Sequence, residues 1–524
     1  MRTIILIIVF SGFITVSVAQ NKVPDVEQEL NYLTAYKPAA FPHDTDRIRS
    51  LEKVFPAVEK IYHEYARKNH FPAIAYGIVA DGKLIYSGAT GVINLKNQNK
   101  VTTRSLFRIA SMTKSFTAMA IMKLQEDGKL SLADRAWKHV PEMKDFVYAT
   151  REATPITIHN LLTMTAGFPE DNPWGDRQLE DTDEEFLNFL KGGVSFSSTP
   201  GQQFEYSNLG YAILGNIITR VSGMPYQQFI TQNILQPLGM NQTQWEFSNV
   251  NPDELVLGYR WEDERWKEEP MLHDGAYGAM GGLITSIEDF AKYVAFHLSA
   301  YPPRNEPEKG PVKRSSVREM HKPYMPRLYT EAKRADGTLC PIVMGYCFGL
   351  GYRQDCEGIV RISHSGGLPG YGSDYKFYPD YGVGVISFAN RTYAGTGGIN
   401  ARVLDTLMLA GALKPRVLPA ADILNKRKSQ LIPVLTSWDE KASRELFAEN
   451  FFLDLSLPDR VRKSKEVFDK AGKIVSVGTM IPDNQLRGYF VMKGEKGDIK
   501  VYFTLSPEKD PKIQQLELNF EAGN

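Results

Sequence analysis

The chain has 524 residues, more than one ordinary hydrophobic core accommodates and enough for a large domain with a smaller one. Apolar residues make up 43% of the chain and charged residues 23%, a balance typical of globular proteins and not of disordered or fibrous ones. Lys and Arg together number 61, as do Asp and Glu, so the formal net charge is zero, which argues against a nucleic-acid binder held by bulk charge.

Residues 1–19 have the pattern of a cleaved signal peptide. Arg2 supplies a positive start, and residues 4–10 are continuously apolar. Ser17 and Ala19 then place small side chains at the positions that a signal peptidase reads. The alternative is a membrane anchor, but the apolar stretch is short for a span and polar residues follow it. We therefore expect an exported protein, periplasmic or extracellular, with no stable transmembrane anchor after cleavage.

The next segments alternate between helical and strand-like patterns. A helix is predicted over residues 46–68. Strand-like residues 73–79 and 83–86 follow, and the dipeptide Asp81-Gly82 between them is a strong hairpin signal.

Two apolar helices are predicted in the middle of the chain. Apolar residues recur at helical spacing over residues 111–126, and Gly128 stops this helix. A second helix covers residues 211–221 and ends at Gly223. Residues 300–341 are poorly periodic and rich in Pro, Lys and Arg, which favours an insertion near the cleft that could act as a lid.

Strands return in the last part of the main segment. Four strand-like stretches separated by short turns predict an antiparallel meander: residues 348–352, 359–362, 374–378 and 383–388. The simplest folding of this order is a mixed α and β (α+β) domain over residues 20–413. Its first and last strands would share an antiparallel sheet flanked by helices, its middle helices would form a second lobe, and a catalytic cleft would lie between the two.

A Pro-rich linker, residues 414–419, separates this segment from a smaller one. Residues 420–524 contain helical stretches, including 441–451, and four strand-like segments near Ile474, Gly488, Val501 and Leu516. They predict a small C-terminal α+β domain, in which no catalytic group is evident.

Three cysteines lie close together at positions 340, 347 and 356. An odd number in an exported chain leaves at least one of them unpaired or intermolecular. One local disulfide is compatible with the spacing, but the sequence does not choose the pair. Because the usual His or Cys partners are missing, we expect no zinc site and no other metal or cofactor.

The pattern Ser-x-x-Lys occurs four times, starting at Ser50, Ser111, Ser373 and Ser506. Ser111 differs from the others because it opens an apolar helix, which places Lys114 on the same face. A serine hydroxyl needs a base, and a buried lysine can act as one when its pKa falls enough to keep it neutral. The alternative is a serine helix cap followed by a solvated lysine.

Two further motifs favour the catalytic interpretation. Tyr206 and Asn208 follow a turn-like Thr-Pro-Gly, and a tyrosine can relay a proton when neighbouring cations lower its pKa. The stretch His364-Ser365-Gly366-Gly367 ends a strand pattern, where glycines let the backbone approach a substrate. The alternatives are an ordinary helix-leading loop and a hairpin turn with a surface histidine.

In this order the motifs resemble those of the serine β-lactamase and penicillin-binding protein superfamily, in particular its class C β-lactamase, D-peptidase and esterase branch. That pattern is Ser-x-x-Lys, then Tyr-x-Asn, then Lys-Thr-Gly or His-x-Gly. The resemblance covers roughly residues 74–390. It implies a β-lactamase/transpeptidase-like fold and a serine hydrolase that acts through an acyl-enzyme.

The resemblance also implies a role for each motif residue. Ser111 would be the nucleophile, and Lys114 and Tyr206 would pass its proton to the leaving group. Asn208 would hold the substrate's amide and orient Lys114. The substrate-binding and oxyanion residues would be His364, Ser365, Gly366 and Gly367, with the N–H groups of Ser111 and Gly367 forming the oxyanion hole.

The resemblance leaves several activities open. A D-amino-acid peptidase or an esterase is favoured, and the alternatives are a true β-lactamase and a non-catalytic penicillin-binding-like receptor. A β-lactamase is less favoured because His364 replaces the lysine that attracts the acidic group of a β-lactam, unless another cation such as Arg391 substitutes for it. The expected partner is a small-molecule or peptide substrate and not a nucleic acid. Nothing in the sequence defines an oligomeric state.

Overall fold

The computed structural model describes residues 31–42, 46–334 and 336–523. The predicted signal peptide lies outside these residues. Within them, no helix combines the length and the apolar character needed to cross a membrane.

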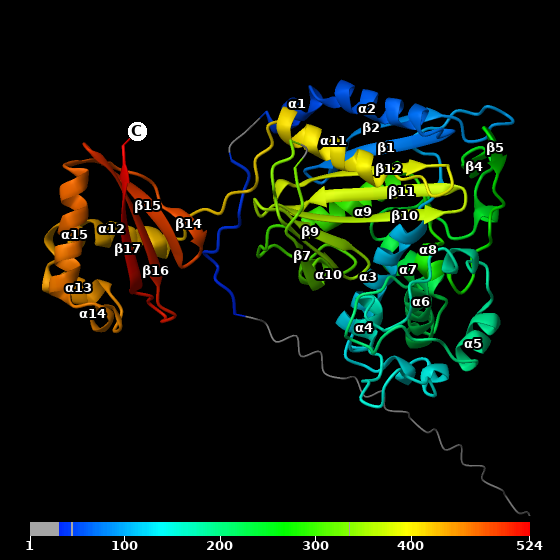
Figure 1. The fold of residues 1–524 in the computed structure, drawn as a ribbon, viewed down its shortest axis with the longest axis horizontal. Helices are drawn as coiled ribbons and strands as arrows, with labels where there is room; N and C mark the ends of the chain where they lie inside the picture. Colours follow the sequence, from blue (N-terminus) through cyan, green and yellow to red (C-terminus); the bar gives the residue numbers. More distant parts are fainter. Residues whose placement is uncertain (1–30, 43–45, 335, 524) are drawn as a thin grey trace, which may run out of the picture. The chain divides into compact units, whose positions relative to one another are not determined.

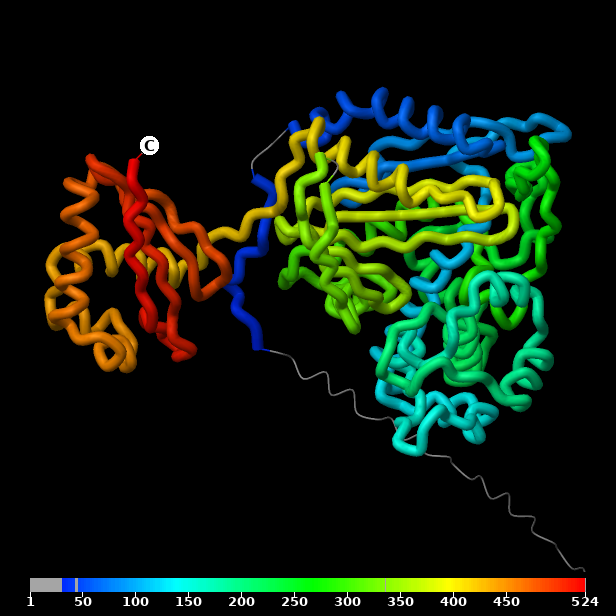
Figure 2. The backbone as a smooth tube through the Cα atoms, in the orientation of Figure 1, coloured from blue at the N-terminus to red at the C-terminus, as the bar shows by residue number. Residues whose placement is uncertain are grey.

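An eight-stranded antiparallel sheet organises the main part of the chain (Figure 1). In spatial order its strands are β2 (Lys83–Gly91), β1 (Ala73–Ala80), β12 (Val383–Ala389), β11 (Tyr371–Tyr378), β10 (Val360–Leu368), β9 (Gly351–Gln354), β8 (Ile342–Tyr346) and β7 (Tyr324–Tyr329). The backbone trace shows the early hairpin, in blue, beside late strands, in yellow (Figure 2). The prediction that the first and last strands share one sheet is therefore confirmed.

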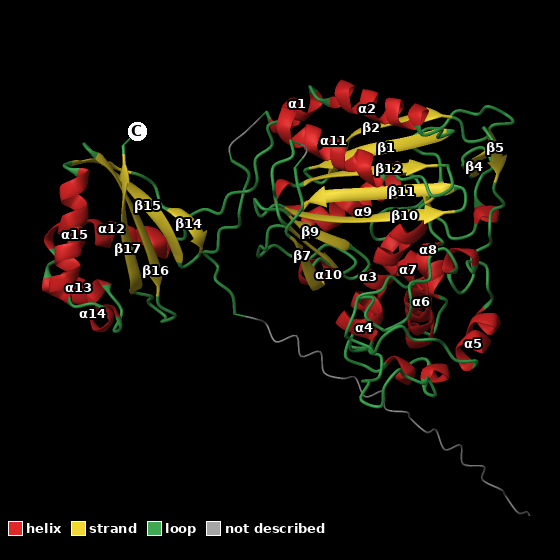
Figure 3. Ribbon diagram, viewed as in Figure 1, coloured by secondary structure: helices red, strands yellow, loops and turns green. Residues whose placement is uncertain are grey.

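Helices cover both faces of this sheet (Figure 3). Helices α2 (Phe55–Lys68) and α11 (Gly397–Ala410) pack on one face and α9 (Ile287–Ser299) on the other. Successive residues of β1 alternate between the two resulting cores, so Ala75 joins one hydrophobic cluster and Tyr76 the other. Because both faces are covered, β1 is buried along its whole length.

The structure refines the first predicted elements. The expected helix over residues 46–68 is divided into α1 (Arg47–Glu52) and α2, with Pro56 in the first turn of α2, where a missing N–H is tolerated. At the hairpin, Asp81 and Gly82 both have positive φ, as a two-residue turn between twisted strands requires.

The middle of the chain forms a helical lobe. Its helices are α3 (Lys114–Glu126), α4 (Ile158–Leu162), α5 (Asp183–Lys191), α6 (Asn208–Ser222), α7 (Tyr226–Ile230) and α8 (Gly278–Gly281). Helix α6 is buried over most of its length and ends at Gly223 in the left-handed conformation, as predicted. Two small ladders accompany these helices: β3 (Phe107–Arg108) with β6 (Ile284–Thr285), and β4 (Tyr259–Glu262) with β5 (Arg265–Glu268).

Two sequence predictions near the sheet edge need correction. Residues 300–341 contain helix α10 (Arg314–Met320) and strand β7, which pairs with β8 and extends the sheet. Residues 348–350, expected to be part of a strand, form the connection between β8 and β9. Phe348 and Leu350 are apolar because this connection is buried in the core.

The C-terminal residues contain a second, five-stranded antiparallel sheet. Its strands are β13 (Ile474–Val477), β14 (Ile481–Asn484), β15 (Arg487–Gly494), β16 (Gly497–Leu505) and β17 (Ile513–Ala522), and the helices of this region are α12 (Asp422–Ser437), α13 (Glu440–Leu446), α14 (Phe451–Asp454) and α15 (Leu457–Ala471). The helix expected over residues 441–451 is split between α13 and α14, and β14 was not predicted. The apolar side chains form their own cluster, from Leu424 to Ile513.

Cys340 and Cys356 form the single local disulfide that the sequence allowed. Cys347 is a buried free thiol, and burial raises its pKa, so it stays protonated at neutral pH.

Candidate active site

Ser111 lies in one 3₁₀ turn, Ala110–Thr113, immediately before α3. The sequence predicted that Ser111 opens the α-helix, but the α-helix begins at Lys114. Side chains three residues apart eclipse each other in 3₁₀ geometry, which brings Lys114 over Ser111. Ala110 holds a left-handed backbone, with φ of 50°, just before the serine.

The Lys114 amine contacts three oxygens. Its Nζ lies 2.9 Å from Oγ of Ser111, 2.7 Å from Oδ1 of Asn208 and 3.0 Å from the carbonyl oxygen of Met280. The amide and backbone oxygens can only accept hydrogen bonds. When Lys114 is neutral, its two N–H groups therefore donate to Asn208 and Met280. The nitrogen lone pair is then left for the Ser111 hydroxyl.

Burial favours this neutral form. Lys114 is 0% exposed, and desolvation lowers its pKa from 10.5 to about 7. The carboxylates of Asp176 and Asp171 oppose the shift but do not reverse it. A substantial fraction of Lys114 can therefore act as a base near neutral pH.

The other Ser-x-x-Lys pairs have different surroundings. The Ser373 hydroxyl donates to the Ile109 carbonyl oxygen at 2.7 Å, and Lys376 forms an ion pair with Asp374 at 2.8 Å. Ser506 donates to a glutamate, Glu508, at 2.7 Å. These hydrogen bonds give Ser373 and Ser506 structural roles, so neither needs a catalytic one.

Asn208, the first residue of α6, is fully buried and orients Lys114. Its Oδ1 accepts from Lys114, while its Nδ2 donates to Oδ1 of Asn172 at 2.6 Å. Nδ2 keeps a second N–H that this bond does not use. Because Asn208 is fully buried behind the cavity lining, the implied contact with a substrate amide would require a lining residue such as Asn172 to move.

The loop of residues 171–177 holds the start of α6 in place. The Asp171 carboxylate accepts the backbone N–H groups of Asn208 at 2.6 Å and Leu209 at 2.7 Å, groups that have no partner within the helix. Gly175 packs so closely that a Cβ there would lie 2.6 Å from Cβ of Asn208.

Tyr206 reaches the nucleophile, but its pKa moves against the expected direction. Its ring lies against Lys114, with Nζ 4.9 Å from the ring centroid, and the nearby Ser111 side chain acts to lower its pKa. Burial raises the pKa of Tyr206 well above its usual value, whereas the proton-relay hypothesis assumed that it falls. Of the two groups beside Ser111, Lys114 is the better base.

His364 is neutral and has a defined tautomer. Burial, followed by the nearby Lys114 charge, lowers its pKa to about 3. Its Nδ1 lies 2.6 Å from the carbonyl oxygen of Ser365, which can only accept, so Nδ1 carries the hydrogen. Nε2 then accepts from the Tyr346 hydroxyl at 3.1 Å. The histidine lies within β10 and is 8% exposed, so it is not a surface residue of a hairpin turn.

The two glycines after His364 let β10 approach the serine turn. A Cβ on Gly366 would lie 2.2 Å from the Ile109 carbonyl oxygen and 3.0 Å from Cβ of Ala110. A Cβ on Gly367 would lie 2.8 Å from the ring of Tyr393. Glycine is therefore needed at both positions for the strand to pass beside Ser111.

Most of the predicted site residues line one cavity of about 330 Å³. Its lining consists of Ser111, Asn172, Pro173, Asp176, Tyr206, His364, Ser365, Gly367 and Tyr393. Lys114, Asn208 and Gly366 lie behind this lining and support it through the contacts described above. The structure thus brings all eight predicted residues to one place.

A comparison with known families identifies the chain. The model of the family described as Beta-lactamase matches residues 58–408, which is more than half of the sequence. The chain belongs to the beta-lactamase family. The resemblance read from the motifs is confirmed, and so is the predicted fold class.

Relatives in this family cover much of the chain. "Protein flp" of Staphylococcus aureus (strain NCTC 8325 / PS 47) is 30% identical over 387 residues, which span 71% of this chain and 70% of the relative. "Beta-lactamase-like protein 2" of Dictyostelium discoideum is 27% identical over 261 residues, which span 48% of this chain and 47% of that protein.

Solved structures show the same family fold. The octameric penicillin-binding protein homologue from Pyrococcus abyssi superposes with a TM-score of 0.57 and 23% identity, covering 89% of this chain and 98% of its own. The penicillin-binding protein from Bacillus halodurans gives a TM-score of 0.53 and 22% identity, covering 66% of this chain and 99% of its own.

Several residues that line or support the cavity lie outside the sequence motifs of the family. Asp171, Asn172 and Asp176 sit in a loop whose composition indicates only a turn, and Tyr393 follows the last strand of the sheet. Tyr346, which fixes His364, lies at the end of β8. Nothing local in the sequence shows that these segments meet.

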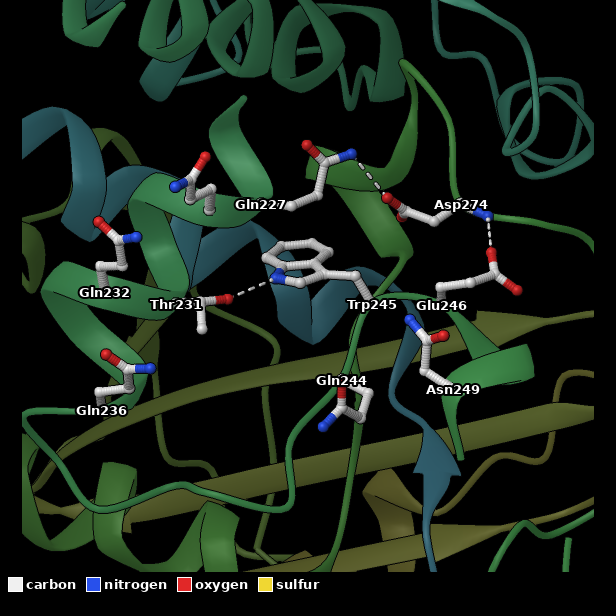
Figure 4. A pocket seen from close by; sticks show the side chains of 10 residues that line it. Gln227, Thr231, Gln232, Gln236, Gln244, Trp245, Glu246, Asn249 and Asp274 are labelled. Carbon is white, nitrogen blue, oxygen red and sulfur yellow. Dashed lines mark hydrogen bonds between the residues drawn. The ribbon is translucent and has the colours of Figure 1, made fainter. Parts of the chain in front are cut away.

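A larger cavity, of about 510 Å³, lies elsewhere in the family domain (Figure 4). Its lining is rich in glutamine, and Trp245 donates from Nε1 to Oγ1 of Thr231 at 3.2 Å. Gln227 donates to Asp274 at 2.7 Å. Among the described residues that line it there is no serine or lysine, so this cavity does not repeat the Ser111 and Lys114 arrangement.

Proposed function

We propose that this protein is an exported serine hydrolase that cleaves amide or ester bonds through an acyl-enzyme on Ser111. The observation that carries the proposal is the contact between Ser111 Oγ and Lys114 Nζ, 2.9 Å apart, in surroundings that lower the lysine pKa to about 7. A nucleophile and a base within hydrogen-bond reach, with the base oriented by a third group, form the minimal machinery for acyl transfer.

In the proposed reaction, neutral Lys114 takes the proton of Ser111 while Oγ bonds to the substrate carbonyl carbon. The carbonyl oxygen becomes negative and is stabilised by the N–H groups of Ser111 and Gly367. The bond to the leaving group then breaks, and the proton held by Lys114 passes to that group, with Tyr206 beside Ser111 as a relay. Water attacks the acyl-enzyme by the same route in reverse and regenerates Ser111.

A peptidase or esterase is favoured over a β-lactamase. His364 is neutral, and among the described residues lining the cavity there is no Lys or Arg. Arg391, considered as a replacement charge, donates to the Asn69 carbonyl oxygen at 2.8 Å and stands over the ring of Phe71. A substrate carboxylate would therefore find Ser365 but no fixed cation.

Two features support export. One is the signal-peptide pattern of residues 1–19. The other is the Cys340–Cys356 disulfide, because disulfides persist mainly in oxidising compartments outside the cytosol.

The test is covalent labelling with a fluorophosphonate, followed by mass analysis of the labelled peptide. We expect the label on Ser111, none in Ser111→Ala, and normal labelling in Ser50→Ala, which removes a serine from a Ser-x-x-Lys pair outside the site. Because the neutral fraction of Lys114 grows with pH, the labelling rate should rise about tenfold per pH unit below pH 7 and level off above it.

Turnover assays then separate the candidate activities. A panel of D-Ala-D-Ala peptides, p-nitrophenyl esters and cephalosporins should show hydrolysis of esters or peptides that Ser111→Ala lowers by several orders of magnitude. A folded sample that takes no label would indicate a non-catalytic receptor and contradict the proposal. Labelling at Ser50 would contradict the assigned nucleophile.

A further inference from the structure

Asp176 is a buried carboxylate with a free oxygen in the proposed active site. It is 2% exposed and lines the same cavity as Ser111. Oδ2 accepts a hydrogen bond from the Tyr393 hydroxyl at 3.1 Å. Oδ1 is buried and has no hydrogen-bond partner among the residues that the structure describes. A buried acceptor without a partner is costly, so a group that donates to it would be bound favourably.

The neighbouring Asp171 shows what a purely structural carboxylate looks like in this loop. Its two oxygens accept the N–H groups of Asn208 and Leu209, and the Ser207 hydroxyl lies 3.4 Å from Oδ2. Asp171 therefore caps α6, whereas one oxygen of Asp176 has no comparable partner.

The cavity holds the Asp176 carboxyl and no fixed cation when the enzyme is ready to react. Burial raises the pKa of Asp176 to about 6, and the Lys114 charge opposes this rise. Lys114 must be neutral to accept the Ser111 proton, so it no longer balances Asp176. Among the described lining residues there is no other cation, and His364 is neutral. Arg177 next to Asp176 is exposed and outside this lining, although its charge helps to lower the pKa of Asp176. A positive group on the substrate would restore the balance.

We propose that Asp176 binds a protonated amine of the substrate, so that the enzyme prefers acyl compounds that carry a free ammonium group beside the scissile carbonyl. Unblocked amino-acid amides, amino-acid esters and peptides with a free N-terminus have this chemistry. Because Oδ1 is buried, a small shift of the Asp176 side chain would bring it to the cavity surface, where an ammonium can donate to it. Tyr393 already donates to Oδ2. The inference rests on the proposed function, because it places the ammonium in the same cavity as Ser111.

Asp176 could instead act only through Lys114, whose pKa its charge raises. The two roles predict different results. A positioning role changes the reaction of every substrate equally and moves the pH profile. Recognition of an ammonium changes only substrates that carry one.

The experiment compares alanine p-nitroanilide with its N-acetyl derivative, in both D and L forms, on the full chain. We expect the wild type to prefer the free amine in kcat/KM by about tenfold or more, which corresponds to about 1.4 kcal/mol. Asp176→Asn, which keeps the shape but removes the charge, should abolish most of this preference. The measure is the ratio of the two kcat/KM values, because loss of the Asp176 charge also lowers the pKa of Lys114 and so changes the rates of both substrates. Glu170→Gln removes an exposed charge from the same region and should change neither rate.

Fluorophosphonate labelling of Ser111 separates failure of this inference from failure of the proposed function. Labelled enzyme without an amine preference, or an equal loss on both substrates in Asp176→Asn, would overturn the role of Asp176 alone. Absence of labelling in the wild type would overturn the proposed function.

A second measurement tests the inference even if turnover is slow or the variant is unstable. Millimolar alaninamide should protect wild-type Ser111 from the label, and N-acetylalaninamide should protect it much less. Equal protection by the two amides would contradict the inference even if no substrate were cleaved.

Discussion

Lys114 and His364 show how burial decides the chemistry of single side chains. Both are surrounded by protein, and for both desolvation is the main cause of a lowered pKa. For Lys114 the result is a pKa of about 7, suitable for a base, and for His364 it is about 3, which removes the positive charge. The same effect therefore activates the proposed nucleophile and weakens attraction for anionic substrates.

His364→Lys tests the effect of the missing charge. We expect the efficiency of nitrocefin hydrolysis to rise relative to that of a short neutral ester, because a lysine introduces a cation beside the nucleophile. His364→Gln is the matched control, since it also loses the ring contacts to Tyr346 and Ser365 but stays neutral. Rapid nitrocefin turnover by the wild type, with ester cleavage barely detectable, would refute the argument.

The 3₁₀ turn of Ser111, helix α3 and strand β10 form the site through their close packing. The sequence correctly indicated a helix after Ser111 and a strand before the glycines. It did not indicate the 3₁₀ turn, because the left-handed Ala110 is imposed by neighbouring backbone and not by its own preference. The strand expected at residues 348–352 was wrong over residues 348–350 and right at residues 351 and 352, which begin β9. A buried connecting segment has the same apolar sequence pattern as a strand.

Gly366→Ala tests the approach of β10 to the serine turn. The added methyl would lie 2.2 Å from a backbone oxygen, that of Ile109, which cannot rotate away. We expect a loss of about 1–3 kcal/mol in the free energy of unfolding and slower labelling of Ser111. The control Gly398→Ala adds a methyl where nothing lies within 4 Å. Urea denaturation measures the free energy of unfolding of both variants. If Gly366→Ala were as stable as Gly398→Ala, the strand could shift to accommodate the methyl and the prediction would be wrong.

In the described part of the chain, the apolar side chains of the C-terminal region form a cluster separate from those of the main domain. The C-terminal cluster runs from Leu424 to Ile513. The linker predicted at residues 414–419 is partly held by backbone hydrogen bonds. The N–H of Arg416 donates to the carbonyl oxygen of Asp380 at 2.9 Å, and the N–H of Val417 donates to the carbonyl oxygen of Ala40 at 2.7 Å.

Truncation tests the predicted division into residues 20–413 and 420–524. A chain ending at Lys414 should remain soluble and keep Ser111 labelling, because the site and its supporting contacts precede that point. A chain ending at Pro419 should be more stable, since it retains the bonds of Arg416 and Val417. Thermal denaturation and labelling compare the two. Aggregation of both would mean that the C-terminal residues belong to the main core.

The sequence by itself determined the fold class, the Ser111–Lys114 pair and the order of the three motifs. These features depend on spacing within short segments, where helical period, turn residues and side-chain chemistry can be read directly. Only the tertiary structure decided that Cys340 pairs with Cys356, that Asn172 accepts a hydrogen bond from the Asn208 amide, and that Asp176 lines the cavity of the nucleophile. Those facts depend on segments far apart in the chain, and the pKa values follow from the burial that their contacts create.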